Sequence, residues 1–427
     1  MAALSEQAQI SRLIHRFGFG PKPGQFEKLL RAGLTKTQRE ILSVPAVDAG
    51  LAPVVTPTFS PTGILPGGVT RALLAAENNQ LLFWWLDRMV LSDNALPERM
   101  TWFWHGHWAT AVSKVIYPIP MLQQNQTLRA SALGDFSTMS ENMITDCALL
   151  YWLDAELNSA KAPNENLARE LMELFTLGIG NYTQADVQAV AQALTGYRVQ
   201  LAAGQVAYYP TLHDNSIVTI LGSTSSFTGP QVVGYLTSLY ANQQFIADRL
   251  WFRFFDSSAP QPDSTVTDAF ASRDITAAVR ALIHHRALAN PAHSQAKSPV
   301  EWFVSVCRAL AVQPSTLALP KTVLNGLGNL GQIPFNPPNV GGWPADQFWL
   351  TAAAAEQRIA LSSYLIQHGD LSPIAQLSPR DRVEGLAMWL GVPEWGKSTR
   401  DLLSQVRTDP FRLTWLAVNA PEYVVNR

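Results

Sequence analysis

Apolar residues recur every three to four positions in most segments of this chain, which is the pattern of helices that bury one face. The first segment with this spacing contains Ile10, Leu13, Ile14 and Phe17. A strongly helical pattern covers residues 69–92, and Pro97 begins another helix because proline suits the first helical position. The same spacing returns over residues 118–160, 230–290 and 299–311. The sequence therefore predicts a mainly α protein.

Three segments interrupt the helical pattern. Residues 46–68 and 331–347 are rich in Pro and Gly, which predicts two long loops. Residues 197–228 contain alternating apolar and polar side chains with many β-branched and aromatic residues. This segment is predicted to form a small β hairpin or sheet inserted among the helices.

The composition excludes several classes of protein. The chain has 427 residues, 47% of them hydrophobic, and a formal net charge of −2, so it is neither disordered nor basic enough to indicate nucleic-acid binding. Cys147 and Cys307 are the only cysteines, which excludes a disulfide scaffold. No apolar run predicts a membrane span, and the N-terminus lacks an export pattern. We therefore expect a cytoplasmic protein, or an exported one if a signal has been removed.

Two histidines lie in a dense aromatic segment, Trp102-Phe103-Trp104-His105-Gly106-His107-Trp108. Imidazole is a common metal ligand and a base near neutral pH. Residues two apart on a helix point about 200° apart, so an ideal helix would not direct both rings at one ion. Gly106 could distort the helix and relax this objection. The alternative is an aromatic core helix with hydrogen-bonded histidines.

A second candidate is the polar stripe of the helix that starts at Asn164. Helical spacing places Asn166, Arg169, Glu170 and Glu173 on one face and the apolar residues on the other. The two carboxylates could bind a cation or share a proton, with Arg169 or Asn166 orienting them. The alternative is a solvated surface helix.

A third candidate is the pair His213 and Asp214, in a turn between two β-rich stretches. A loop between strands suits a functional site, but an ordinary Asx turn explains the same residues. The chain has no phosphate-binding glycine motif, no Gly-x-Ser-x-Gly and no His-Glu-x-x-His. Nucleotide-driven, serine-hydrolase and zincin chemistries therefore lack their usual sequence support.

Several segments, taken in order, resemble one bacterial family. They are RLIHRFGFGP, ERMTWFWHGHWATA, PNENLARELMELFTLGIGNYTQADVQAVAQALTGY, LHDNSIVTILG, FIADRLWFRFF, KSPVEWFVSVCRAL, GQIPFNPPNVGGWP and APEYVVNR. Over nearly its whole length, the chain resembles the family catalogued as domain of unknown function 1800. The resemblance implies a single α-rich domain over residues 1–427. Phe175 stands where many relatives have His.

The family resemblance also implies that the polar motifs recur together, so we expect a shared polar or metal-binding cleft. Imidazole and carboxylate ligands suit a divalent metal ion, whose identity is unknown. The candidate ligands are His105, His107, Glu170, Glu173, His213 and Asp214. Glu170 or His107 would act as general base on a bound water, and Arg169 would hold a carboxylate or a substrate anion. The candidate substrate-binding residues are Asn166, Asn339 and Trp343.

These expectations favour a metal-dependent enzyme acting on an unknown small molecule or polymer. Hydrolysis ranks ahead of oxidation, because the Glu-x-x-His signature of helical di-iron proteins is absent. The alternative is a non-catalytic binding or assembly protein. In that protein the polar residues would form a structural network, and the two Pro/Gly-rich loops would be interaction surfaces.

Overall fold

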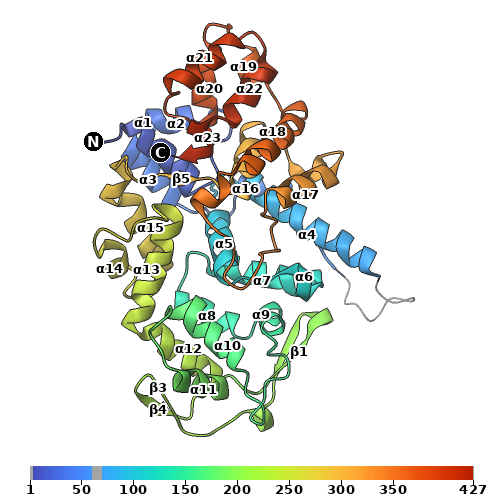
Figure 1. Ribbon diagram of the computed structural model, residues 1–427, viewed down its shortest axis with the longest axis vertical. Helices are drawn as coiled ribbons and strands as arrows, with labels where there is room; N and C mark the ends of the chain where they lie inside the picture. Colours follow the sequence, from blue (N-terminus) through green and yellow to red (C-terminus); the bar gives the residue numbers. More distant parts are fainter. Residues whose placement is uncertain (1–2, 60–69, 427) are drawn as a thin grey trace.

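The computed structural model describes residues 3–59 and 70–426 and shows a mainly α-helical chain (Figure 1). Three two-stranded antiparallel sheets are the only sheets in the described residues. The predicted fold class is therefore confirmed. Within the same residues, no helix combines the length and the apolar character that a membrane-spanning segment needs.

The helices fall into two groups, separated along the chain by the β insert. The helices before it are α1 (Glu6–Arg16), α2 (Gln25–Ala32), α3 (Leu34–Leu42), α4 (Arg71–Leu91), α5 (Leu96–His107), α6 (Val112–Val115), α7 (Pro118–Ser131), α8 (Phe136–Met143), α9 (Cys147–Trp152), α10 (Glu165–Glu170) and α11 (Gln184–Ala193). The helices after it are α12 (Gly229–Ser238), α13 (Tyr240–Phe254), α14 (Thr265–Ala269), α15 (Ile275–His284), α16 (Pro299–Ala309), α17 (Pro320–Asn329), α18 (Ala352–Gln367), α19 (Ser372–Ala375), α20 (Arg382–Leu390), α21 (Lys397–Gln405), α22 (Pro410–Val418) and α23 (Pro421–Val424).

The β insert consists of two short hairpins. Strand β1 (Tyr197–Gln200) pairs with β2 (Gln205–Tyr208), and β3 (Val218–Ile220) pairs with β4 (Ser223–Ser225). These strands lie where the alternating pattern predicts them. A third pair, β5 (Gln295–Ala296) with β6 (Val425–Asn426), was not predicted and ties the end of the chain to the segment before α16.

Helix starts follow from local capping chemistry. Ser298 and Glu301 form a reciprocal capping box at α16, with Pro299 as the first helical residue. Thr183 and Asp186 form a second reciprocal capping box, at α11. Such caps satisfy the free N–H groups of the first turn, so short-range sequence signals are enough to locate these helix starts.

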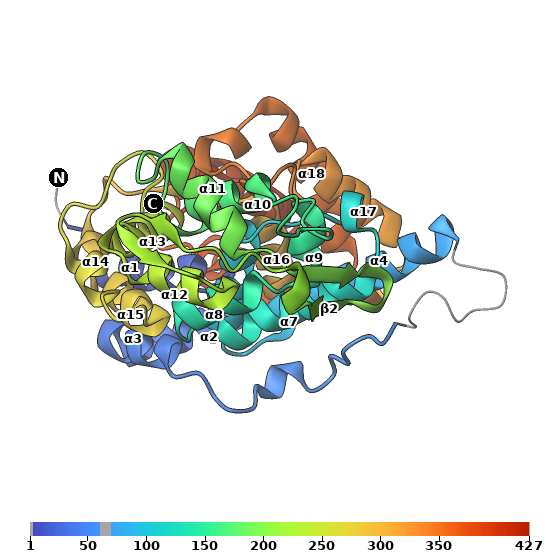
Figure 2. The same cartoon turned by 90° about the horizontal axis from the view of Figure 1, so that it is seen from below.

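Helix α5 lies between two large hydrophobic cores. Phe103 and Trp104 belong to the first core, which packs α7–α15, and Trp102 belongs to the second, which packs α4, α16–α18 and α20–α23. Figure 1 shows α7–α12 below α5 and α18–α22 above it, with α13–α15 to the left and α4 to the right. Figure 2 shows α13–α15 and α4 on opposite sides of the molecule. The organisation of the whole chain as one domain stays a prediction.

The two Pro/Gly-rich segments run as irregular chain where the structure describes them. Residues 46–59 contain a single 3₁₀ turn, Ala49–Leu51, while residues 60–68 of this predicted loop lie outside the described residues. The 331–347 loop contacts α5, because a Cβ atom on Gly342 would lie only 2.3 Å from the carbonyl oxygen of Gly106. The residues of this loop are therefore held against the aromatic segment that contains both candidate histidines.

Candidate functional site

His105 faces the second core and contacts the 331–347 loop. Its Nε2 atom accepts the N–H of Phe335 at 3.1 Å, and its ring packs beside Trp85 and Trp343. Burial lowers the pKa of His105 to about 3, so the imidazole is neutral at physiological pH. The Nε2 lone pair is already used to hold the loop.

His107 faces the first core, as the rotation between residues two apart on a helix predicts. Its Nε2–H donates to the carbonyl oxygen of Phe175 at 2.9 Å, which ties α5 to the helix that contains the carboxylates. The rings around it are those of Phe103, Trp104, Trp108, Phe136, Phe175 and Phe245. Burial, with the charge of Arg249, holds its pKa well below the ordinary value.

The helix with the polar stripe changes its winding part-way along. Asn164 caps α10 by accepting the N–H of Leu167 at 2.7 Å, and the helix continues from Leu171 to Thr176 as a π-helix. We call Glu165–Thr176 the carboxylate helix. A π turn is rare and occurs frequently at functional sites, because it re-aims side chains at an energetic cost. Glu170 precedes this turn and Glu173 lies within it.

Glu170 and Glu173 form a half-buried acidic pair. Tyr182 donates its O–H to Glu173 Oε2 at 2.5 Å, whereas Glu170 has no hydrogen-bond or ion-pair partner among the described residues. Burial raises the pKa of Glu170, and the charge of Glu173 raises it further. Burial and the hydrogen bond to Glu173 raise the pKa of Tyr182 to about 12. Tyr182 is a member of this cluster that the sequence motifs did not indicate.

The other polar residues of the carboxylate helix make their hydrogen bonds outside the acidic pair. Arg169 donates to Gln184 Oε1 at 2.7 Å and lies 3.9 Å from Glu165. Asn166 donates to the carbonyl oxygen of Leu153 at 3.3 Å. Arg169 still lowers the pKa of Glu170 through its charge, so it belongs to the electrostatic surroundings of the pair.

His213 and Asp214 make local contacts within the β insert and with Thr195, just before it. His213 is buried, with Nδ1 3.1 Å from the carbonyl oxygen of Thr195. Asp214 Oδ1 accepts the N–H of Ser216 at 2.9 Å, which is the Asx turn considered as an alternative above. Hydrogen bonding by the side chain of Ser216, together with this backbone N–H, lowers the pKa of Asp214.

The loop residues Asn339 and Trp343 have different surroundings. Asn339 is exposed and its Oδ1 accepts the N–H of Gly341 at 2.8 Å. Trp343 is buried and stacks on Trp102, with ring centroids 4.9 Å apart. Trp343 is therefore part of the second core rather than an open pocket wall.

The six candidate metal ligands are not gathered around one point. Over residues 3–59 and 70–426, no three His, Cys, Asp or Glu side chains lie close enough together to hold a metal ion. His105, His107 and His213 each face a different backbone group. The arrangement does not fit one ion held by all six residues, and divalent-metal binding stays a prediction.

The comparisons with known proteins bear on the chain as a whole. The family described as protein of unknown function (DUF1800) matches residues 12–425. The chain belongs to this family. No curated protein and no solved structure matches it. DUF1800 membership accounts for the order of the motifs along the chain but assigns no activity to them.

A cavity of about 590 Å³ in this DUF1800 protein was not indicated by any motif. It lies between α7, α8 and the first hairpin, and Asp146, Tyr197 and Tyr208 are in its wall. Asp146 caps α9, and burial raises its pKa to about 7. Only its N-cap position is visible in sequence, because the burial depends on elements distant along the chain.

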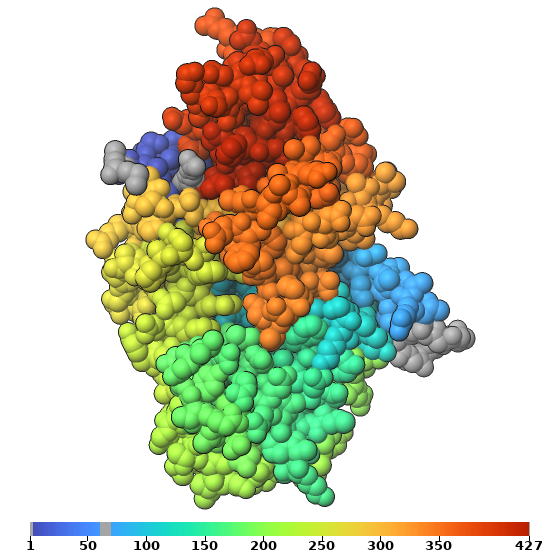
Figure 3. Space-filling model, viewed as in Figure 1, coloured from blue at the N-terminus to red at the C-terminus, as the bar shows by residue number. Residues whose placement is uncertain are grey.

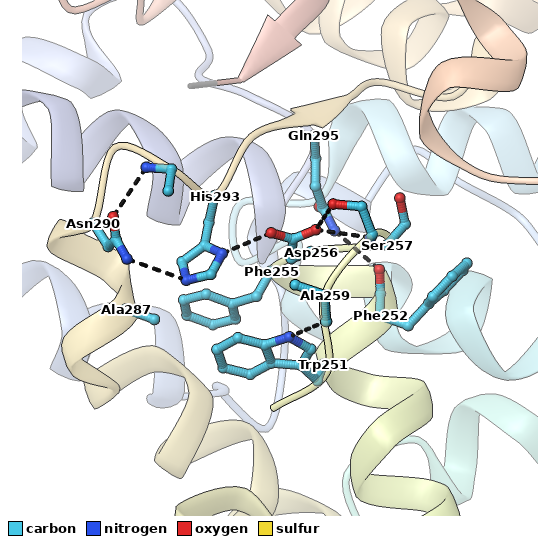
Figure 4. A network of polar contacts seen from close by, with 12 residues as sticks. Trp251, Phe252, Phe255, Asp256, Ser257, Ala259, Ala287, Asn290, His293 and Gln295 are labelled. Atoms are coloured by element: carbon cyan, nitrogen blue, oxygen red, sulfur yellow. Dashed lines mark hydrogen bonds and ion pairs between the residues drawn. The ribbon is translucent and has the colours of Figure 1, made fainter. Parts of the chain in front are cut away.

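A further titratable cluster closes the end of α13 (Figure 4). His293 Nδ1 lies 2.7 Å from Asp256 Oδ2, and Ser258 donates two hydrogen bonds to Asp256 Oδ1. Burial acts to raise the pKa of Asp256, but these hydrogen bonds outweigh it and hold the pKa below its ordinary value. Gln295 also bonds the carbonyl oxygen of Phe252, so this cluster ties α13 to β5.

Proposed function

We propose that this protein is a hydrolase in which Glu170 and Glu173 act as an acid–base pair. The observation that carries the proposal is the unpartnered, half-buried Glu170 carboxyl beside Glu173 at the π turn. Pairs of carboxyl groups in different environments are a common basis for acid–base chemistry. Glu173 has a phenol donor and Glu170 has no donor among the described residues, so their environments differ.

The two carboxyl groups would take complementary roles. Glu173 accepts the O–H of Tyr182, a bond that suits the ionised carboxylate, and would remove a proton from the attacking water. Glu170 has a raised pKa and would give its proton to the leaving group as the bond to the substrate breaks. Transfer of the proton from Glu173 back to Glu170 through water restores the starting state. None of these steps involves a metal ion.

The proposal is tested by screening hydrolytic activity in matched variants. The substrates are nitrophenyl esters, phosphates and glycosides, each assayed with EDTA and with Mn²⁺. Loss of a general acid or base costs about 100-fold or more, so Glu170→Gln and Glu173→Gln should each lose that much turnover. Glu165→Gln, on the same stripe, is the control and should keep wild-type activity.

Equal turnover in the wild type and in both pair variants would contradict the proposal. Activity that disappears with EDTA and returns with Mn²⁺ would instead support the metal-dependent form of the enzyme expected from the sequence. In that case the carboxylate pair would be a ligand set, since Mg²⁺ and related ions bind through one or two carboxylates and retain water.

A further inference from the structure

Two arginines on α13 lie one helical turn apart. Arg249 and Arg253 are both half-buried, and like charges four residues apart on a helix repel each other. Arg253 donates to the carbonyl oxygen of Trp343 at 2.8 Å, which places it at the boundary between α13 and the 331–347 loop. Figure 3 shows the surface hollowed between the yellow α13 segment and the orange loop.

The positive charge of Arg253 has no carboxylate of its own. No acidic oxygen of the described residues lies within 4.0 Å of it, and Glu301, whose charge acts on it, is paired with Arg99 at 2.7 Å. Burial lowers the pKa of Arg253 to about 10, and the charge of Arg249 acts in the same direction. The carbonyl groups of Trp343 and Pro344 accept hydrogen bonds from Arg253 but do not neutralise its charge.

The positive charge of Arg249 has even fewer partners among the described residues than that of Arg253. Arg249 makes no hydrogen bond or ion pair with a described residue, although burial lowers its pKa. Buried arginines elsewhere in the chain donate to several carbonyl groups: Arg12 binds those of Leu288 and Asn290, and Arg308 binds those of Val90 and Ser92. Arg249 lies close enough to His107 for its charge to lower the pKa of that histidine.

We propose that Arg249 and Arg253 bind the anionic group of a small ligand, a carboxylate or a phosphate, beside the 331–347 loop. A guanidinium offers paired N–H donors that match both groups. Arg249 has no acceptor among the described residues, and a bound anion would supply one. An anion also removes the repulsion between the two arginines. This inference does not depend on the Glu170–Glu173 proposal.

The test titrates the full-length protein with inorganic phosphate and, separately, with succinate, at constant ionic strength. Binding to the folded state raises the melting temperature, so the shift reports affinity. The variants are Arg249→Gln and Arg249→Lys, and the control is Arg280→Gln, an exposed arginine of α15. Removing Arg249 also removes a repelling charge, so the glutamine variant should fold.

We expect at least one of the two anions to raise the melting temperature of the wild type and of Arg280→Gln. Arg249→Gln should lower the affinity for that anion by about tenfold or more. Arg249→Lys should lower it by less, because lysine keeps the charge without the paired donors. If only phosphate or only succinate raises the melting temperature, that result identifies the anionic group that the site binds. The proposal is overturned if neither anion raises the melting temperature at about 10 mM. It is also overturned if the anion raises the melting temperature of Arg249→Gln as much as that of the wild type.

Discussion

His107 shows how a candidate ligand can have a structural role. Its ring fills an aromatic cage, and its Nε2–H holds the carbonyl oxygen of Phe175. We predict that His107→Ala lowers the free energy of unfolding by about 2–4 kcal/mol, through the cavity and the lost hydrogen bond. Urea unfolding measures this, with exposed His284→Ala as the control. A loss of unfolding free energy that occurs in the presence of Mn²⁺ but not of EDTA would instead identify His107 as a metal ligand.

Asp146 makes stability depend on pH. Its pKa is about 7 in the folded state and about 3.9 in an unfolded chain. Between these values only the folded state holds the proton, so stability falls as pH rises through this window. Asp146→Asn keeps an Oδ1 acceptor for the N–H of Leu149 and cannot ionise.

We therefore predict that Asp146→Asn becomes more stable relative to the wild type as the pH rises. The unfolding free energy of the variant minus that of the wild type should be about 2–3 kcal/mol larger at pH 8 than at pH 5. Urea unfolding at the two pH values measures it. An equal difference at both would show that the carboxyl group ionises normally in the folded protein.

Among the elements, the carboxylate helix has some features that the sequence predicts and others that it does not. Asn164 and the apolar spacing through Leu167 and Leu171 predict a helix, and these signals are local. The π turn after Glu170 is not visible in this pattern, because it depends on packing of the helix against other elements. The stripe was predicted, but the pairing of Tyr182 with Glu173 was not.

The 331–347 loop approaches α5 closely at one glycine. Gly342 has φ +82°, and a Cβ there would lie 2.3 Å from a backbone oxygen. We predict that Gly342→Ala lowers the free energy of unfolding by about 3 kcal/mol or more, since it adds a clash to the backbone strain. The control is Gly180→Ala, which has φ +88° and open space around it and should cost about 1 kcal/mol. Equal losses, measured by urea unfolding, would show that the loop moves away freely.

In the whole molecule, α5 links the two cores, since Trp102 packs in one and Trp104 in the other. We predict that both cores unfold in a single transition, because neither keeps its packing without α5. Far-ultraviolet circular dichroism and tryptophan fluorescence should give the same urea midpoint. Two separated midpoints would indicate two independent domains.

The parts of the molecule that sequence did not predict depend on contacts between distant segments. Residues 295–296 and 425–426 are too short to read as strands, and they pair only because the fold brings the chain end to that position. Arg249 lies on an ordinary helical pattern, and its lack of an acceptor in residues 3–59 and 70–426 is visible only once its neighbours are placed. His105 and His107, two apart on one helix, face different cores as helix geometry predicts.

The acid–base pair is tested most directly by the titration of Glu170. Carboxyl ¹³C chemical shifts of glutamate-labelled protein, assigned with Glu170→Gln, give the pKa of this group. We predict a pKa above the ordinary value of about 4.3, and a fall toward that value in Glu173→Gln, where the neighbouring charge is absent. A Glu170 pKa at or below the ordinary value, unchanged in Glu173→Gln, would contradict the proposed pair.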